Sequence, residues 1–425
     1  MMTISPQSGL PLSVLFAPAH HALDADYGGS EYYWAYALIS TLGFQFGLRG
    51  YAVTGTLIGS PTFPSTIHVH QIRSSKPPDM SILGSIRFTL SYSAVIARTL
   101  SQQHFDIMHH VLPFRINRTI NLPAVMQKSS RIPFVIGPVQ IPLGYDDLDA
   151  VNVVARRFES LHISIKKKSV GDNLLLLLSP LLRALSTATL RRANAVIAVN
   201  NSARAIYSKY VAPERIRVIP PGIDTVRFRV KALRDSHEPI RVLSCGYLIR
   251  RKRFDMLLRA FARLARRWKR IELWIIGDGP QRSQLERMAS NLKIADYVRF
   301  LGFIPHNQIH QYYEEVDIYC TTSRAESFGQ TILEAMAAGL PVIATRTTGA
   351  SELVRHEETG LLVDEEDEIG VSEALERLIV DRESAVTFGH RAREIAEKYY
   401  DWREIAKQYF SLYNQLLHRQ NNCFL

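Results

Sequence analysis

Alternation of short apolar runs with helical periods is the feature that most constrains this chain. Some predicted strands, such as residues 195–199, are apolar at every position, as in parallel strands that are covered on both faces. Strand–helix alternation of this length predicts doubly wound α/β sheets. The predicted strands are residues 12–17, 51–58, 105–110, 134–137, 195–199, 216–220, 240–245, 272–277, 298–301, 317–321 and 342–345. The predicted helices between them include residues 32–42, 254–268, 280–292, 330–338 and 372–379.

Length and composition narrow the class of protein. A chain of 425 residues is long enough for two or three domains. Hydrophobic residues make up 46% and charged residues 21%, which excludes a disordered chain, a collagen and a coiled coil. The longest leucine run, residues 174–178, is far shorter than the roughly 18 apolar residues of a membrane span. We therefore expect a soluble globular protein.

The composition of the N-terminal residues and the number of cysteines indicate where in the cell the protein is expected. The first residues lack a basic stretch before their short apolar run, so we expect no signal peptide. Three cysteines are too few and too scattered for a disulfide framework or a zinc site. These features predict a cytoplasmic protein, with peripheral attachment to the cytoplasmic face of a membrane left open.

The net charge of +11 is unevenly distributed. Residues 226–300 carry 19 basic and 7 acidic side chains, whereas residues 301–425 carry 11 and 21. Residues 151–192 combine eight basic and two acidic side chains with the leucine run. An interfacial helix on anionic lipid and a helical hairpin that buries its leucines both fit this segment. Zinc-finger spacing and aromatic RNA-binding signatures are missing from the sequence, so we expect no nucleic-acid partner.

The strongest local motif is RAESFGQTILEA at residues 324–335. It lies between a predicted strand and a predicted helix, whose N-terminus offers N–H groups and a positive dipole end to a phosphate. Gly329 lets the backbone approach a ligand closely. Glu326 and Glu334 stand eight positions apart, and their carboxylates can accept hydrogen bonds from sugar hydroxyls on either side of the phosphates.

Three further strand–turn–helix junctions carry glycines or cations. Residues 245–254, CGYLIRRKRF, place four cations after a predicted strand, where they can bind a diphosphate or form a solvated basic loop. Residues 275–280, IIGDGP, lack the third glycine of a dinucleotide fingerprint because Arg282 occupies its position. Residues 27–30, YGGS, form another close-approach loop after the first strand. The missing glycine disfavours a nicotinamide oxidoreductase.

Taken together, these motifs resemble the retaining glycosyltransferases of family 4, which have the GT-B fold. The similar motifs lie in order over residues 194–380, and the N-terminal half is similar only through Gly28, Gly29 and residues 105–109. Residues 219–224 resemble the family's interdomain V-I-P-N-G-V-D, with Pro221 in place of the usual asparagine. The family motifs are E-x7-E at 326–334, G-x-L-x3-K at 246–252, I-I-G-D-G-P at 275–280, F-L-G at 300–302, A-x-G-x-P-V-I-A at 337–344 and T-G-L-L-V at 359–363.

The resemblance implies an α/β protein of the GT-B class, with two Rossmann-like doubly wound domains facing a cleft. Residues 1–225 would form the acceptor-binding domain and residues 226–398 the nucleotide-sugar-binding domain. A linker is also indicated by the break in composition at residues 220–224. Residues 399–425 would form a helix that packs back on the N-terminal domain.

The resemblance also implies roles for particular residues. Glu326 would contact the transferred sugar, Lys252 would neutralise the diphosphate, and His109 would lie near the donor sugar. Glu334 would hold the ribose hydroxyls, while backbone N–H groups at the start of the following helix would meet the diphosphate. Tyr247 departs from the family, which usually has arginine there; Arg250 or Arg251 can supply that charge. The implied donor-binding residues are Gly28, Gly29, Arg251, Gly277, Ser327, Phe328, Gly329, Gln330, Thr331 and Glu334.

The implied activity is transfer of a sugar from a nucleotide-sugar donor to a glycan or lipid-linked acceptor, with retention of configuration. Because Lys252 and backbone N–H groups can neutralise the diphosphate, we expect no metal and no cofactor. Asp24 and Asp26 fit a D-x-D metal motif but have no supporting context. Two alternatives stay open: an inactive nucleotide-binding scaffold, which Tyr247 favours, and a phosphorylase of the same fold.

Overall fold

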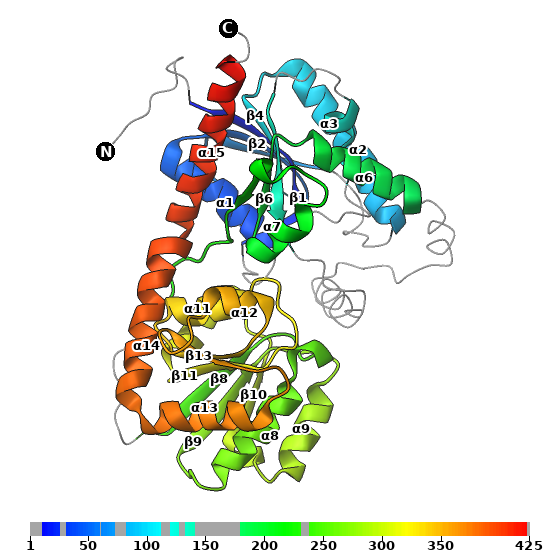
Figure 1. The fold of residues 1–425 in the computed structure, drawn as a ribbon. Helices are drawn as coiled ribbons and strands as arrows, with labels where there is room; N and C mark the ends of the chain where they lie inside the picture. The colour runs from blue at the N-terminus through cyan, green and yellow to red at the C-terminus, as the bar shows by residue number, and fades with distance from the viewer. Residues whose placement is uncertain are drawn as a thin grey trace. The chain divides into compact units, whose positions relative to one another are not determined.

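The computed structural model describes residues 11–25, 31–59, 61–72, 82–111, 120–126, 132–140, 179–230 and 238–422. These residues form two compact units (Figure 1). The first unit contains the described residues up to Gly222 together with those from Trp402 onward. The second unit contains the described residues between Ile223 and Asp401. Each unit is a parallel α/β sheet with its own core.

The sheet of the first unit has seven parallel strands in the order β3-β2-β1-β4-β5-β6-β7. Strands β4 and β6 are buried at every position; the sequence of β6, AVIA, is wholly apolar, whereas β4, IMHH, ends in two buried histidines. The strands are β1 (Ser13–Asp24), β2 (Arg49–Ile58), β3 (Ile67–Gln71), β4 (Ile107–His110), β5 (Phe134–Val139), β6 (Ala195–Ala198) and β7 (Ile216–Val218).

The C-terminal helix α15 (Trp402–Asn422) packs in the first unit, alongside α1 (Glu31–Phe46) (Figure 1). Its Phe410 ring stacks on Phe46 at a centroid distance of 4.3 Å. Apolar side chains at helical spacing, including Ile405 and Leu412, are buried on the same helix. The other helices of this unit are α2 (Ile82–Gln102), α3 (Leu122–Met126), α6 (Ser179–Arg192) and α7 (Asn201–Tyr207), with a 3-10 turn at Pro213–Arg215.

The sheet of the second unit has six parallel strands in the order β10-β9-β8-β11-β12-β13. The strands are β8 (Ile240–Cys245), β9 (Ile271–Ile276), β10 (Val298–Gly302), β11 (Ile318–Thr321), β12 (Val342–Thr345) and β13 (Gly360–Val363). The helices are α8 (Phe254–Ala265), α9 (Arg282–Asn291), α10 (His306–Glu314), α11 (Gln330–Ala337), α12 (Thr348–Leu353), α13 (Glu368–Val380) and α14 (Arg382–Ile395). Short 3-10 turns occupy Arg250–Lys252 and Ala295–Tyr297, and a π-helical turn occupies Ala396–Tyr400.

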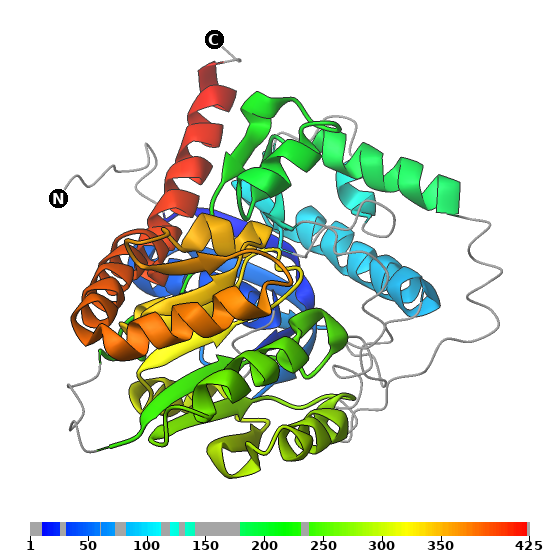
Figure 2. The same ribbon diagram turned by 60° about the horizontal axis from the view of Figure 1, so that its bottom comes forward.

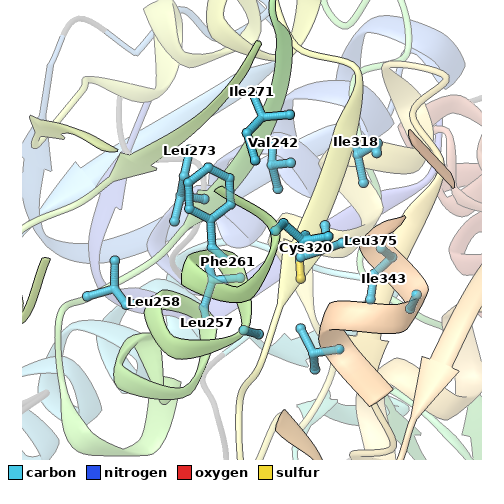
Figure 3. Packing of buried hydrophobic residues seen from close by; sticks show 14 of the residues in the cluster. Val242, Leu257, Leu258, Phe261, Ile271, Leu273, Ile318, Cys320, Ile343 and Leu375 are labelled. Atoms are coloured by element: carbon cyan, nitrogen blue, oxygen red, sulfur yellow. The ribbon is translucent and has the colours of Figure 1, made fainter. Parts of the chain in front are cut away.

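One face of this sheet carries the main apolar core of the second unit. Leu257 and Phe261 of α8 pack with Val242 of β8, Leu273 of β9 and Leu375 of α13 (Figure 3). Helices α8 and α13 lie side by side (Figures 1 and 2), and both contribute buried apolar side chains to this cluster. The core holds the sheet rigid beneath the loops that follow its strands.

The point where the strand order reverses lies between β8 and β11. Strand β8 is followed along the chain by β9 and β10 on one side, and β11 is followed by β12 and β13 on the other. In open α/β sheets the loops after two such strands diverge and leave a crevice at their carboxyl ends. Ligands of the second unit are therefore expected at the loops after Cys245 and Thr321.

The predicted fold class is confirmed, since the chain forms two parallel doubly wound sheets. Two edge strands, β3 and β13, were not among the predicted strands. Residues 151–178, which include the leucine run, lie outside the described residues, and residues 179–192 form α6. None of the described helices is both long and apolar enough to cross a membrane.

Candidate functional site

The loop after β8 forms the first wall of the candidate site. The Gly246 N–H donates to the carbonyl of Ile276 at 3.0 Å, which joins this loop to the end of β9. A Cβ atom at Gly277, which has a φ of 130°, would lie 1.9 Å from the Gly246 carbonyl oxygen. Gly277 therefore allows the two strand ends to meet closely. The 3-10 turn that follows, Arg250–Lys252, carries the cations.

The loop between β11 and α11 forms the second wall and is fastened to the first. The Thr322 hydroxyl donates to the carbonyl of Arg253 at 2.8 Å. The Arg324 N–H donates to the carbonyl of Arg251 at 2.8 Å. These bonds, one from a side-chain hydroxyl and one from a main-chain N–H, set the distance between the two loops, and the Arg251 guanidinium adds a further bond to the carbonyl of Ala325. The cations of one loop consequently lie beside the carboxylate of the other.

Glu326 is the centre of this charge cluster. The Lys252 ammonium and the Ser323 hydroxyl both donate to Oε1 of Glu326, the latter at 2.9 Å. A guanidinium nitrogen of Arg251 lies 3.7 Å from Oε2 of Glu326. The side chains of Glu326, Lys252 and Arg251 keep 13, 11 and 21% of their surface exposed, so solvent or a ligand can reach them.

The pKa of Glu326 is lowered by these contacts. Burial raises the pKa of the carboxyl, but the charges of Lys252 and Arg251, together with hydrogen bonds from Lys252 and Ser323, outweigh that effect. Glu326 is therefore ionised at neutral pH. The cluster thus holds an anionic carboxylate beside two cationic groups, all three of them partly exposed.

The N-terminus of α11 completes the second wall. Gly329 precedes the helix with a φ of 95°, and a Cβ atom there would lie 3.1 Å from the Ile332 side chain. The N–H groups of Ile332 and Leu333 both donate to the Gly329 carbonyl. The N-terminus of a helix is also the positive end of its dipole, and anions commonly bind there.

Glu334 lies deeper, on the inner face of α11, and is 1% exposed. The Tyr313 hydroxyl donates to Oε2 of Glu334 at 2.9 Å, and Nε2 of His306 lies 3.4 Å from Oε1. These two partners belong to α10, a helix that the sequence analysis did not connect with the site. Tyr313 lies within an ordinary apolar pattern, so only its position in space reveals the contact.

The second unit brings together most of the predicted donor residues. Arg251 and Lys252 each contact Glu326. The chain continues from Glu326 into α11 through Ser327, Phe328, Gly329, Gln330 and Thr331. Tyr247 is half-buried in the loop that carries Lys252. Gly28 and Gly29 lie outside the described residues. Ser323, three residues before Glu326, is a contact that sequence reasoning missed.

His109 lies in the first unit and is fully buried. Its Nδ1 is 2.7 Å from the Tyr413 hydroxyl and its Nε2 is 3.0 Å from the carbonyl oxygen of Gly137. Burial lowers the pKa of His109 to about 3, against a smaller opposing effect of the Gly137 hydrogen bond. The neutral ring thus has both nitrogens engaged inside its own unit, which favours a structural role; the catalytic role stays a prediction.

The prediction that the reaction needs no metal concerns Asp24 and Asp26, the residues of the D-x-D motif. Asp24 is buried at the end of β1, and Asp26 lies outside the described residues. Across the ranges that the structure describes, no group of three or more His, Cys, Asp or Glu side chains is arranged to hold a metal ion. The prediction that the reaction needs no metal is left for experiment.

Comparison with known proteins places the chain in a class. Residues 227–395 match the family model described as glycosyl transferases group 1, and residues 153–227 match that of glycosyltransferase family 4. A solved structure, the sucrose-phosphate synthase of Thermosynechococcus elongatus, is similar with a TM-score of 0.67 and 23% identity. That similarity covers 96% of this chain and 99% of that one, and it shows the fold.

Curated relatives are similar in sequence over about half of the chain. The GDP-mannose-dependent alpha-(1-6)-phosphatidylinositol monomannoside mannosyltransferase of Mycobacterium tuberculosis is 32% identical over 254 residues, 56% of this chain and 65% of that protein. The lipopolysaccharide core biosynthesis glycosyltransferase LpsE of Rhizobium meliloti is 32% identical over 201 residues, 46% of this chain and 57% of that protein. The chain thus spans less than two thirds of the length of these relatives.

The fold is that of the GT-B class, and the donor-side motifs resemble those of glycosyltransferases. The two matching family models adjoin and together cover residues 153–395, which supports the resemblance to the family-4 glycosyltransferases that the sequence motifs indicated.

Proposed function

We propose that the protein transfers a sugar from a nucleotide-sugar donor to an acceptor hydroxyl, with retention of the anomeric configuration. The observation that carries this proposal is the cluster of Lys252, Arg251 and Glu326 beside the N-terminus of α11. Two cations and a helix N-terminus suit a diphosphate, and a carboxylate at the same opening suits a sugar hydroxyl. A nucleotide sugar carries both groups in one molecule.

In this proposal the donor diphosphate binds between Lys252 and the first turn of α11. The Lys252 ammonium then exchanges part of its contact with Glu326 for a phosphate oxygen. Negative charge grows on the diphosphate as the sugar leaves, so Lys252, Arg251 and the N–H groups of α11 stabilise the transition state more than the ground state. Glu326, freed in part, accepts a hydrogen bond from the transferred sugar.

Retention is proposed to follow from a front-face reaction. The bond between the anomeric carbon and the diphosphate oxygen breaks, and a bond from that carbon to the acceptor oxygen forms on the same face. The acceptor proton passes to an oxygen of the departing phosphate, which leaves as the nucleoside diphosphate. Glu326 is held by Lys252 and Ser323, which suits a positioned contact better than an attacking nucleophile.

The acceptor is proposed to be a glycan or a lipid-linked intermediate. The name of the Mycobacterium tuberculosis relative describes transfer to a phosphatidylinositol mannoside. In the first unit of this chain, Arg183 and Arg191 of α6 line a hollow of about 620 Å³ together with apolar side chains such as Val125. Exposed arginines beside apolar surface suit the headgroup region of an anionic membrane, so we extend the proposal to peripheral attachment at the cytoplasmic face.

The proposal is tested with a panel of nucleotide sugars that includes GDP-mannose and UDP-glucose. We expect at least one to raise the melting temperature of the wild type and to release nucleoside diphosphate slowly in water. The Lys252→Ala variant should lose both effects. If no member of the panel stabilises the wild type or is turned over, the proposed activity is wrong.

The same assay separates the two alternatives. A scaffold protein would bind a nucleotide sugar but would not turn it over with any acceptor that is added. A phosphorylase accepts inorganic phosphate and releases a sugar phosphate, which is detected by phosphorus NMR. Retention is checked by the coupling constant of the new anomeric proton.

A further inference from the structure

Two buried tyrosines lie directly beneath the candidate donor site. Tyr313 of α10 and Tyr319 of β11 are both fully buried, and their rings stack at a centroid distance of 5.9 Å with an interplanar angle of 23°. Packing alone would account for two aromatic rings in a core. Their hydroxyl groups require a separate explanation, because a buried hydroxyl costs free energy unless it is hydrogen-bonded.

The Tyr313 hydroxyl is directed at Glu334. It donates to Oε2 of Glu334 at 2.9 Å and lies 3.4 Å from the carbonyl oxygen of Thr331. Burial, followed by the negative charge of Glu334, raises the pKa of Tyr313 well above its usual value. The phenol therefore keeps its proton and acts as a donor, which holds the carboxylate in one orientation.

The Tyr319 hydroxyl joins the two walls of the site. It donates to Oγ1 of Thr331, in the first turn of α11, at 2.7 Å. It also lies 3.5 Å from the carbonyl oxygen of Cys245, the last residue of β8. Cys245 leads into the loop that carries Lys252, whereas Thr331 belongs to the helix start that faces the same opening. One hydroxyl thus contacts both elements.

From these contacts we infer that Tyr313 and Tyr319 are positioning residues of the donor site, with separate tasks. Tyr313 orients Glu334 toward the ribose hydroxyls of the nucleotide. Tyr319 sets the position of the first turn of α11 against the end of β8, where the diphosphate binds. The inference rests on the proposed function, because it assigns parts of a nucleotide to the two halves of that site.

The two tasks give different signatures in nucleotide binding. Removing the Tyr313 hydroxyl leaves the Glu334 carboxylate with the longer contact to His306, 3.4 Å at Oε1, so its orientation is less fixed. The contact with ribose is weakened, and the phosphate contacts stay in place. Removing the Tyr319 hydroxyl shifts the first turn of α11. It therefore weakens the diphosphate contacts equally for nucleotides with ribose and for those with deoxyribose. Phenylalanine fills the same volume as tyrosine, so neither change creates a cavity.

The experiment measures dissociation constants by calorimetry for GDP and UDP and for their 2′-deoxy forms. We expect Tyr313→Phe to weaken ribonucleotide binding about tenfold and to bring the ribo- and deoxynucleotide constants close together, since a hydrogen bond to a charged group is lost. Tyr319→Phe should weaken both forms by a similar factor and keep their ratio. In steady-state assays both variants should raise the donor KM more than they lower kcat.

A second variant tests the Tyr319 bond from its other end. Thr331→Val removes the acceptor of that hydrogen bond with little change of shape. If the bond does the positioning, Thr331→Val should weaken diphosphate binding as Tyr319→Phe does. The double variant should be no weaker than either single variant, because both changes break the same bond.

A matched control separates positioning from general stability. Tyr92 of α2, in the first unit, is also fully buried and donates to the carbonyl of Ile120. Tyr92→Phe should lower the melting temperature about as much as the two test variants and leave nucleotide binding unchanged. The inference is overturned if both test variants bind the nucleotides with the wild-type dissociation constants. It is also overturned if the Tyr92→Phe control weakens nucleotide binding as much as the test variants do. Failure of the wild type to bind either diphosphate would instead reject the proposed function, and the inference with it.

Discussion

The Lys252 ammonium group donates a hydrogen bond to the Glu326 carboxylate across 74 positions of sequence. The two residues come from the loops after β8 and β11, the two strands at which the order of the sheet reverses. Each residue serves as the other's partner, so neither charge is buried without compensation. A diphosphate bound at this place would compete with Glu326 for Lys252, which couples donor binding to the release of the carboxylate.

This coupling predicts that Glu326→Ala lowers turnover by about two orders of magnitude or more. The estimate is the scale of losing one positioning or charge-stabilising contact in a transition state. The measurement is kcat with the donor identified by the nucleotide-sugar panel. A variant with the wild-type rate would remove Glu326 from the site.

Glu334→Ala is expected to act differently, because Glu334 is assigned to the nucleotide and not to the reacting sugar. It should weaken nucleotide binding, seen as a higher donor KM, with a smaller change in kcat. Comparison of KM and kcat for the two glutamate variants distinguishes the roles. Equal losses of kcat in Glu326→Ala and Glu334→Ala would contradict the assignment of different roles to the two glutamates.

The lowered pKa of Glu326 predicts a pH dependence of stability. A carboxyl whose pKa is depressed in the folded state stabilises that state above its ordinary pKa, 4.5, and loses this contribution as the pH falls through the folded value. The wild type should therefore be more stable than Glu326→Gln at pH 7, and the difference should shrink below about pH 4.5. The measurement is the free energy of unfolding in urea at several pH values. A difference that stays constant over this range would mean that the carboxylate is not held by its charged partners.

Chelation tests the metal prediction. Activity should survive EDTA, since Lys252 and the N–H groups of α11 are proposed to neutralise the diphosphate. The measurement is the turnover rate before and after dialysis against the chelator. Loss of activity that magnesium or manganese restores would instead direct attention to Asp24 and Asp26.

The basic side chains of residues 151–192 predict salt-sensitive binding to anionic vesicles. Each basic residue near such a surface contributes about 1 kcal/mol, and the attraction is screened over about 10 Å at 0.1 M salt. Co-sedimentation should fall for a variant with Lys166, Lys167 and Lys168 changed to serine, and for one with Arg183, Arg191 and Arg192 changed to serine.

The control for this experiment removes three exposed cations from the second unit, Arg266, Lys269 and Arg270. Its vesicle binding should match that of the wild type. Equal sedimentation of every variant, or no sedimentation of the wild type, would remove the membrane from the account and leave a soluble acceptor.

Arg393 of α14 predicts a large effect on stability. Its guanidinium donates to the carbonyl oxygens of Phe228 and Ala337, and to that of Thr225 at 2.8 Å. Arg393→Met leaves these carbonyls without that donor, so it should lower the free energy of unfolding by about 2–3 kcal/mol. The exposed Arg391 on the same helix gives the control variant Arg391→Met, which should change stability by less than about 0.5 kcal/mol. Similar losses in the two variants would contradict this account.

The alternation of apolar runs and helical periods was enough to predict the class of fold, because parallel strands covered on both faces cannot be polar at many positions. Strands β8 and β12 were predicted at their observed bounds, residues 240–245 and 342–345. Strand β3 was missed because its sequence, IHVHQ, has only two apolar residues, as an edge strand with a solvated side permits. Its pairing with β2 supplies stability that its own composition does not indicate.

The sequence by itself was enough to predict which residues would line the donor side of the proposed site. At residues 245–254 and 321–330 a strand end, a glycine, charged residues and a helix start lie within ten positions, and such local order is visible in a sequence. Only the tertiary structure decided which of these residues touch. Contact between Lys252 and Glu326, or between Tyr313 and Glu334, depends on the order in which strands pair across the sheet. The burial of His109 between Gly137 and Tyr413 was decided in the same way, because its second partner comes from a helix 304 positions later in the chain.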